Sequence, residues 1–144
     1  MTDSFNLERF LSAQEAVYPQ VLDELHDGAK RSHWIWFIFP QMKGLGHSTQ
    51  ANYFGIGSLE EAAAFLRHPV LGPRLGRCTR LVTLVEGRKI REILGSPDDL
   101  KFRSSMTLFA RAAVDAGVAP TDFKDALKKY FNGEPDPLTL ALLR

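Results

Sequence analysis

Residues 32–41, SHWIWFIFPQ, decide whether this chain folds with or without a β-sheet. Periodicity cannot separate a buried strand from a buried helix here, because every position from Trp34 to Phe39 is apolar. The aromatic and β-branched residue types favour a strand. Against a strand, Ser32 is a good helix N-cap, Pro40 is a good stop, and the rest of the sequence offers no strong partner strand. We therefore predict a short buried helix.

Helical patterns dominate the sequence around this run. An apolar face in residues 7–14 predicts one helix, and Pro19 suits the first turn of a second helix that Gly28 ends. Ser58 is an N-cap signature with Glu61 at the capping-box position, which predicts that another helix starts there.

The second half of the chain continues the helical pattern. From Leu71 onward apolar residues recur every three or four positions, as in an amphipathic helix. Residues 96–99, SPDD, combine a cap, a proline at the first helical position and acids at the positive end of the helix dipole, and Gly117 ends that helix. Two further helices are predicted, one carrying Phe123 and one after Asp136. We expect an all-α, irregularly packed single domain over residues 1–144, with about six to eight helices.

Composition narrows the function classes. A chain of 144 residues suits one domain, and a net charge of +1 gives no overall field that attracts nucleic acid or an acidic membrane. The single cysteine, Cys78, excludes an internal disulfide and fits a reducing cytosol. The N-terminus lacks signal-peptide features, no apolar run is long enough to span a bilayer, and no Cys/His cluster has zinc-site spacing. We expect a cytoplasmic protein with no metal, cofactor, membrane or nucleic-acid partner.

The aromatic run carries the first candidate site residues. His33 has an intrinsic pKa near neutrality that suits acid–base work, although a histidine at the edge of a core is more often structural. Trp34 and Trp36 each carry an indole N–H that requires a partner when buried, and either ring is able to stack on an aromatic ligand or on a neighbouring side chain.

The loop after this run is the second candidate. Gly44 and Gly46 permit backbone geometries that expose amide N–H groups, and Lys43 and His47 flank them. Such a loop can hold an anion, with Gln41 at its start. It matches neither a P-loop nor a dinucleotide-binding fingerprint, so a simple turn is the alternative.

Two helical segments supply further polar groups. Arg74 lies in the part of its helix that glycine and proline interrupt, where a guanidinium can grip phosphate or carboxylate. Lys101, Ser104 and Ser105 share a helix face beside the apolar stripe. The two serines indicate either a ligand or close helix packing, because serine is a poor residue for a helix interior.

Taken together, these segments resemble the uncharacterised family known as domain of unknown function 1810. The resemblance rests on these stretches: residues 10–14 (FLSAQ) with Tyr18, 30–41 (KRSHWIWFIFPQ), 44–46 (GLG), 58–62 (SLEEA), 68–75 (HPVLGPRL) and 98–109 (DDLKFRSSMTLF). The family implies a single, mainly α-helical domain and carries no established activity. Some members are labelled calpastatin, a long flexible protease inhibitor, and the compact apolar-rich composition of this chain contradicts that label. In helical makeup the family is also similar to domains that act on ADP-ribose-type compounds, an analogy of architecture alone.

Two functional hypotheses follow. In the first, the domain binds a small anionic ligand such as a nucleotide or an ADP-ribose-type compound. If the domain is an enzyme, it also processes this ligand. His33 is then the candidate catalytic acid–base group, and the candidate ligand-binding residues are Trp34, Trp36, Gln41, Lys43, His47, Arg74, Lys101, Ser104 and Ser105. This hypothesis requires these residues to converge on one pocket bordered by an indole ring. In the second, the domain is a non-enzymatic protein–protein interaction module.

Overall fold

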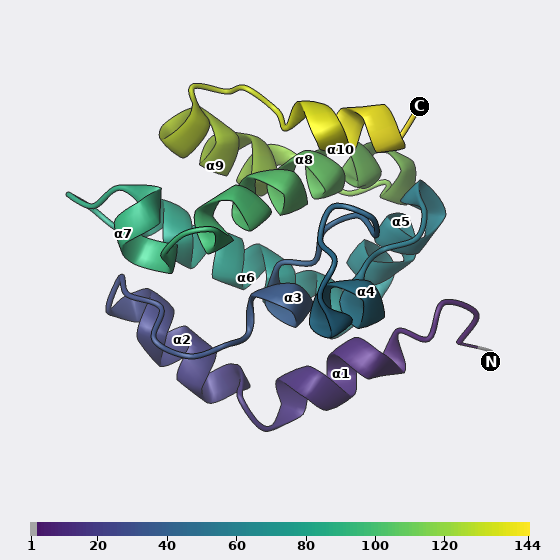
Figure 1. The fold of residues 1–144 in the computed structure, drawn as a ribbon, viewed down its shortest axis with the longest axis horizontal. Coiled ribbons are helices and arrows are strands. Elements are labelled where there is room, and N and C mark those ends of the chain that lie inside the picture. The colour runs from purple at the N-terminus through teal and green to yellow at the C-terminus, as the bar shows by residue number, and fades with distance from the viewer. Residues whose placement is uncertain (1–2) are drawn as a thin grey trace.

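The computed structural model describes residues 3–144, and in that range the chain forms ten helices and no sheet (Figure 1). The helices are α1 (Glu8–Glu15), α2 (Tyr18–His26), α3 (Ile35–Ile38), α4 (Thr49–Phe54), α5 (Leu59–Arg67), α6 (Leu71–Leu84), α7 (Ile90–Leu94), α8 (Asp98–Ala116), α9 (Thr121–Phe131) and α10 (Pro137–Leu142). The all-α prediction is confirmed. The expected count of about six to eight helices is exceeded, because the short helices α4 and α7 add to the helices predicted above.

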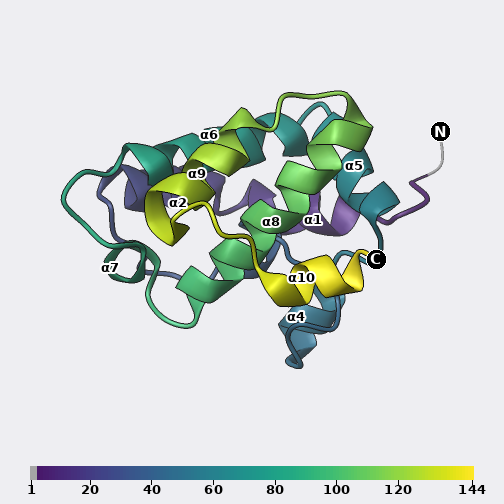
Figure 2. The same cartoon turned by 90° about the horizontal axis from the view of Figure 1, so that it is seen from above.

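The longest helix, α8, packs against α5 on one side and α9 on the other. Helices α1 and α2 lie along the lower edge in Figure 1, α3 lies in the middle beside α4, and α9 and α10 lie along the upper edge. Figure 2 shows α8 running obliquely between α9 and α10. Aromatic rings join these layers in one core cluster, with Phe65 in contact with both Phe10 and Phe109 and with Phe39 edge-on to Phe102.

The aromatic run forms the predicted short buried helix, α3. Burial of Trp34, Ile35, Ile38 and Phe39 holds it in the core, since four residues cannot form a stable helix alone. Ser32 is not its cap as predicted. The helix begins after Trp34, and the Ser32 hydroxyl instead donates to the Glu24 carboxylate at 2.6 Å.

Of the predicted caps, Ser58 is confirmed, whereas Ser96 is not the cap of α8. The side chains of Ser48, Ser58 and Asp136 each accept a backbone N–H in the first turn of α4, α5 and α10. Glu61, expected to complete a capping box, instead accepts from the Gly57 amide. Pro97, expected at the first helical position, is the N-cap residue of α8.

Helix α7 was not predicted, because five residues are too few to show a helical period. Throughout residues 3–144, none of the helices has the length and the hydrophobicity needed to cross a lipid bilayer.

Candidate functional site

A pocket of about 380 Å³ lies between the 41–46 loop, the start of α8 and α10. Three of the ten predicted site residues line it: Gln41, Lys101 and Ser104. The other lining residues are Leu45, Gly46, Pro97, Leu100, Arg103, Asp136 and Leu138. We call this the Lys101 pocket. Its volume lies in the range of sites that hold small organic ligands.

The loop wall of this pocket is fixed by backbone contacts. The Lys43 amide donates to the Ile56 carbonyl at 2.8 Å, and the Ile56 amide donates to the Gln41 carbonyl at 2.9 Å. Gly55 allows this approach, because a Cβ atom there would lie 2.8 Å from the Cα of Lys43. The start of the loop that carries Gln41 is therefore held against residues 55–56.

Cationic groups outnumber anionic ones around the pocket. Lys101 and Arg103 contribute two positive charges, and Asp136 contributes one negative charge. Oδ2 of Asp136 already accepts hydrogen bonds from the Ser104 hydroxyl at 3.2 Å and from the Thr139 amide and hydroxyl at 3.0 and 2.6 Å. These bonds stabilise the carboxylate, which keeps its negative charge, so the lining has two cations and one anion.

An aromatic ring lies beside the pocket as well. The Lys101 ammonium is 5.2 Å from the centre of the Trp36 ring and 3.4 Å from Oδ1 of Asp98. Asp98 also pairs with Lys30 at 2.8 Å, so one carboxylate is shared by two ammonium groups. The Trp36 indole nitrogen is buried and finds no hydrogen-bond partner in the described part of the chain. Lys101 is thus only partly neutralised, and an indole donor beside it is unused.

The remaining predicted residues do not converge on this pocket. His33 is exposed and makes no hydrogen bond through its imidazole within residues 3–144. Lys43 is exposed and borders a separate pocket with Arg9 and Glu61. The side chain of His47 is also exposed. Only three of the residues that the ligand hypothesis required therefore share one pocket, and Trp36 contacts Lys101 without lining that pocket.

Three other predicted residues have structural contacts. The Arg74 guanidinium donates to the Gln14 side chain at 3.3 Å and lies 4.5 Å from the Tyr18 ring centre, so it joins α6 to α1 and α2. Ser105 is fully buried, which fits close helix packing. Trp34 is 1% exposed, and this leaves no ring face for a ligand.

The thiol of Cys78 is buried in the core, and burial raises its pKa to about 12. The thiol therefore stays protonated, as expected of a small core residue.

The partner of the Trp34 indole is Glu24, a buried carboxylate on α2. Glu24 accepts five hydrogen bonds: from the Trp34 indole at 3.0 Å, the Arg31 amide at 2.7 Å, the Ser32 amide and hydroxyl at 3.0 and 2.6 Å, and the Gln20 amide at 3.0 Å. Burial alone would raise the pKa of this carboxyl. The hydrogen bonds from Ser32, Arg31 and Trp34 outweigh burial and lower the pKa to about 2.

This depressed pKa predicts an acid-labile component of stability. Because the folded pKa lies below the ordinary value of 4.5, the stabilisation is complete above pH 4.5 and is lost as the pH falls towards 2. The loss amounts to about 3 kcal/mol. Urea unfolding from neutral pH to pH 2 measures it, and the Glu24→Gln variant should lack most of this pH dependence. An equally steep decline in that variant would assign the effect to other carboxyl groups.

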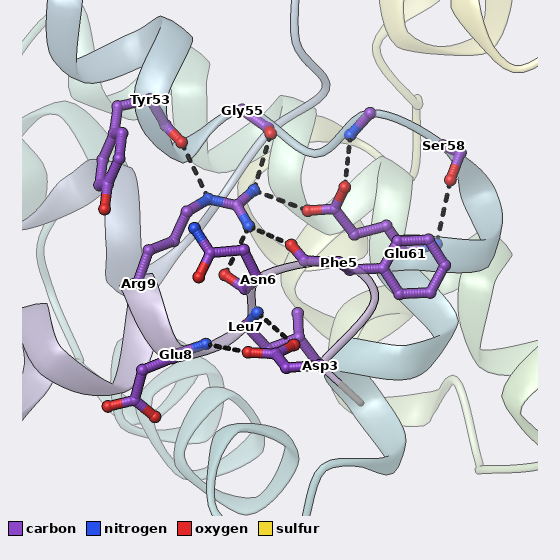
Figure 3. A network of polar contacts seen from close by, with 11 residues as sticks. Asp3, Phe5, Asn6, Leu7, Glu8, Arg9, Tyr53, Gly55, Ser58 and Glu61 are labelled. Carbon is purple, nitrogen blue, oxygen red and sulfur yellow. Dashed lines mark hydrogen bonds and ion pairs between the residues drawn. The ribbon is translucent and has the colours of Figure 1, made fainter. Parts of the chain in front are cut away.

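A second buried ionic network joins the N-terminal segment to α4 and α5 (Figure 3). Arg9 pairs with Glu61 at 2.7 Å, and both side chains are less than a tenth exposed. The guanidinium also donates to the carbonyls of Phe5, Asn6, Tyr53 and Gly55. All five of its N–H donors are therefore used, and neither charge of this pair is available to a ligand.

Sequence reasoning missed Arg103 and Asp136 in the Lys101 pocket. On a helix, Arg103 and Lys101 do not share a face, and they meet the same pocket because they flank Ser104. Asp136 was used only to mark the start of the last helix. It reaches the pocket because α10 folds back onto α8, a contact across 32 residues of sequence that no local pattern indicates.

The fold and site together define an all-α protein with a small, mixed-charge surface pocket. The sequence matches the family described as Protein of unknown function (DUF1810) over residues 4–143, and the chain belongs to this family. A crystal structure of the conserved hypothetical protein Rv1873 from Mycobacterium tuberculosis is similar, with 55% identity, a TM-score of 0.93 and 98% of each chain covered. A comparison with curated proteins found no match.

Proposed function

We propose that this chain binds a small anionic organic ligand, such as a nucleotide or an ADP-ribose-type compound, in the Lys101 pocket. The observation that carries the proposal is the convergence of Gln41, Lys101 and Ser104 on one ligand-sized hollow. These residues come from two segments about sixty positions apart, and the fold places them around the same pocket.

The groups around the pocket suit phosphate or carboxylate recognition. An ammonium and a guanidinium supply charge-assisted hydrogen bonds, which are roughly twice as strong as neutral ones. The Gln41 amide and the Ser104 hydroxyl supply neutral partners. The apolar side chains of Leu45, Leu100 and Leu138 offer a surface for the uncharged part of the ligand.

Ligand-observed NMR and thermal shift with AMP, ADP-ribose, ribose 5-phosphate and inorganic phosphate test the proposal. We expect at least one organic phosphate to bind, and Lys101→Gln to weaken it about tenfold or more through loss of a charge-assisted hydrogen bond. Lys43→Gln is the matched control, because it removes an exposed lysine that does not line this pocket. No binding across the panel, or equal affinities in the two variants, would contradict the proposal.

Exposed leucines favour the interaction module as a second candidate. Leu138 is 66% exposed and Leu142 is 46% exposed, one turn apart on α10, and Leu100 across the pocket is 57% exposed. The basic face of α6 is a weaker candidate, because Arg80 pairs with Asp122 at 2.8 Å. Pull-down with the Leu142→Ser variant separates the functions, because Leu142 is exposed and does not line the Lys101 pocket. An interaction module loses its partner in this variant, whereas ligand binding in the Lys101 pocket is retained.

A further inference from the structure

A second pocket, of about 500 Å³, lies between α8, α9 and α10. Its walls are mainly apolar, with Ala110 and Val114 from α8, Leu127 from α9 and Leu140 from α10. Figure 2 shows these three helices and the connection between α9 and α10 side by side. We call it the α9 pocket. It shares no lining residue with the Lys101 pocket.

Three cationic side chains also line the α9 pocket: Arg111 on α8, and Lys124 and Lys128 on α9. No carboxylate lines the pocket. Among the ion pairs of residues 3–144, none includes any of the three. Lys124 and Lys128 are one helical turn apart, a spacing at which like charges repel. The lining of this pocket therefore carries three positive charges and no negative one.

Apolar surface beside these cations remains open to solvent. Val114 is 70% exposed although it lies on the face of α8 that carries the pocket. Leu127, deeper in the same pocket, is only 5% exposed. A ligand that covered Val114 and reached Leu127 would remove apolar area from water, and its charge would decide whether the cations attract it.

We propose that the α9 pocket binds an organic anion that joins an elongated apolar body to a single acidic head group. The apolar body lies against Val114, Leu127 and Leu140, and the head group lies among Arg111, Lys124 and Lys128. The volume falls in the range of small-molecule sites, and the absence of an acidic lining residue distinguishes this pocket from the Lys101 pocket, which contains Asp136. The occupant is thus defined by both charge and hydrophobicity.

Isothermal titration calorimetry of the full chain with decanoate and decylammonium, which share a chain length and differ in charge, tests this inference. We expect saturable binding of decanoate at one site per chain and at least tenfold weaker binding of decylammonium. Equal affinity for the two probes, or no saturable binding of decanoate, would overturn it.

Variants locate the site. Lys124→Gln/Lys128→Gln should weaken decanoate about tenfold, and Val114→Asp should abolish its binding, since it places an acid among the cations. Arg77→Gln/Arg91→Gln removes the same charge from exposed positions outside both pockets and should leave the affinity unchanged. Methyl NMR should show shifts at Leu127 and Leu140. Equal loss in both double variants, or shifts confined to Leu100 and Leu138, would place the anion elsewhere and overturn the inference.

Discussion

Replacing Glu24 with alanine is expected to destabilise the folded chain by about 4 kcal/mol, because buried donors lose their acceptor. The five hydrogen bonds to this carboxylate include two backbone amides, of Arg31 and Ser32, and the Trp34 indole. Trp34 is almost completely buried, so water cannot replace the lost partner without opening the core. Urea or guanidinium unfolding measures the change as a lower midpoint with a similar slope.

Asp23→Ala is the matched control for this prediction. Asp23 precedes Glu24 on α2 and is exposed, so its loss should change the unfolding free energy by less than about 0.5 kcal/mol. Glu24→Gln keeps an acceptor oxygen but also adds two N–H donors. Its unfolding free energy should therefore lie between those of Glu24→Ala and Asp23→Ala. If Glu24→Ala were as stable as Asp23→Ala, the carboxylate would not be what fixes the 29–34 segment.

Arg9→Ala is expected to cost a similar amount, about 4 kcal/mol, because it leaves the buried Glu61 carboxylate without its cation. Glu61 would keep only the hydrogen bond from the Gly57 amide, and four carbonyl oxygens would lose their donor. Thermal and denaturant unfolding measure the loss.

Two further variants separate geometry from charge. Arg9→Lys preserves the positive charge but cannot reproduce a five-donor fork, so we expect it to recover only part of the lost stability. Arg77→Ala, at an exposed cation outside the network, should change stability by less than about 0.5 kcal/mol. Full recovery in Arg9→Lys would mean that charge alone, and not the hydrogen-bond geometry, holds the N-terminal segment.

The fold class could be predicted because helix caps and apolar spacing are local properties. Ser58 caps α5 as predicted, and Gly117 adopts the left-handed conformation that ends α8. Helix α7 could not be predicted, since its stability comes from packing against α8 and not from its own period. The extent of residues 1–144 as one domain stays a prediction, which the shared core cluster supports.

The candidate site was harder to predict, because it depends on contacts between distant segments. Gln41 and Lys101 were selected for their residue types, and nothing in the sequence showed that they share a pocket while His33 and Arg74 do not. One signal was available and was missed. Glu24 lies at helical spacing from Val21 and Leu25, so an acid stands on an apolar face, a pattern that indicates a buried carboxylate with local donors.

The two indoles occupy opposite environments, although only one residue separates them. Trp34 is sealed in the core and bonded to a carboxylate, whereas Trp36 is half-buried beneath the ammonium of Lys101. The intrinsic fluorescence of the unlabelled protein therefore combines a signal shielded from aqueous quenchers with one that responds to events near the Lys101 pocket. In each spectrum the emission of Trp34 therefore serves as an internal reference for the emission of Trp36.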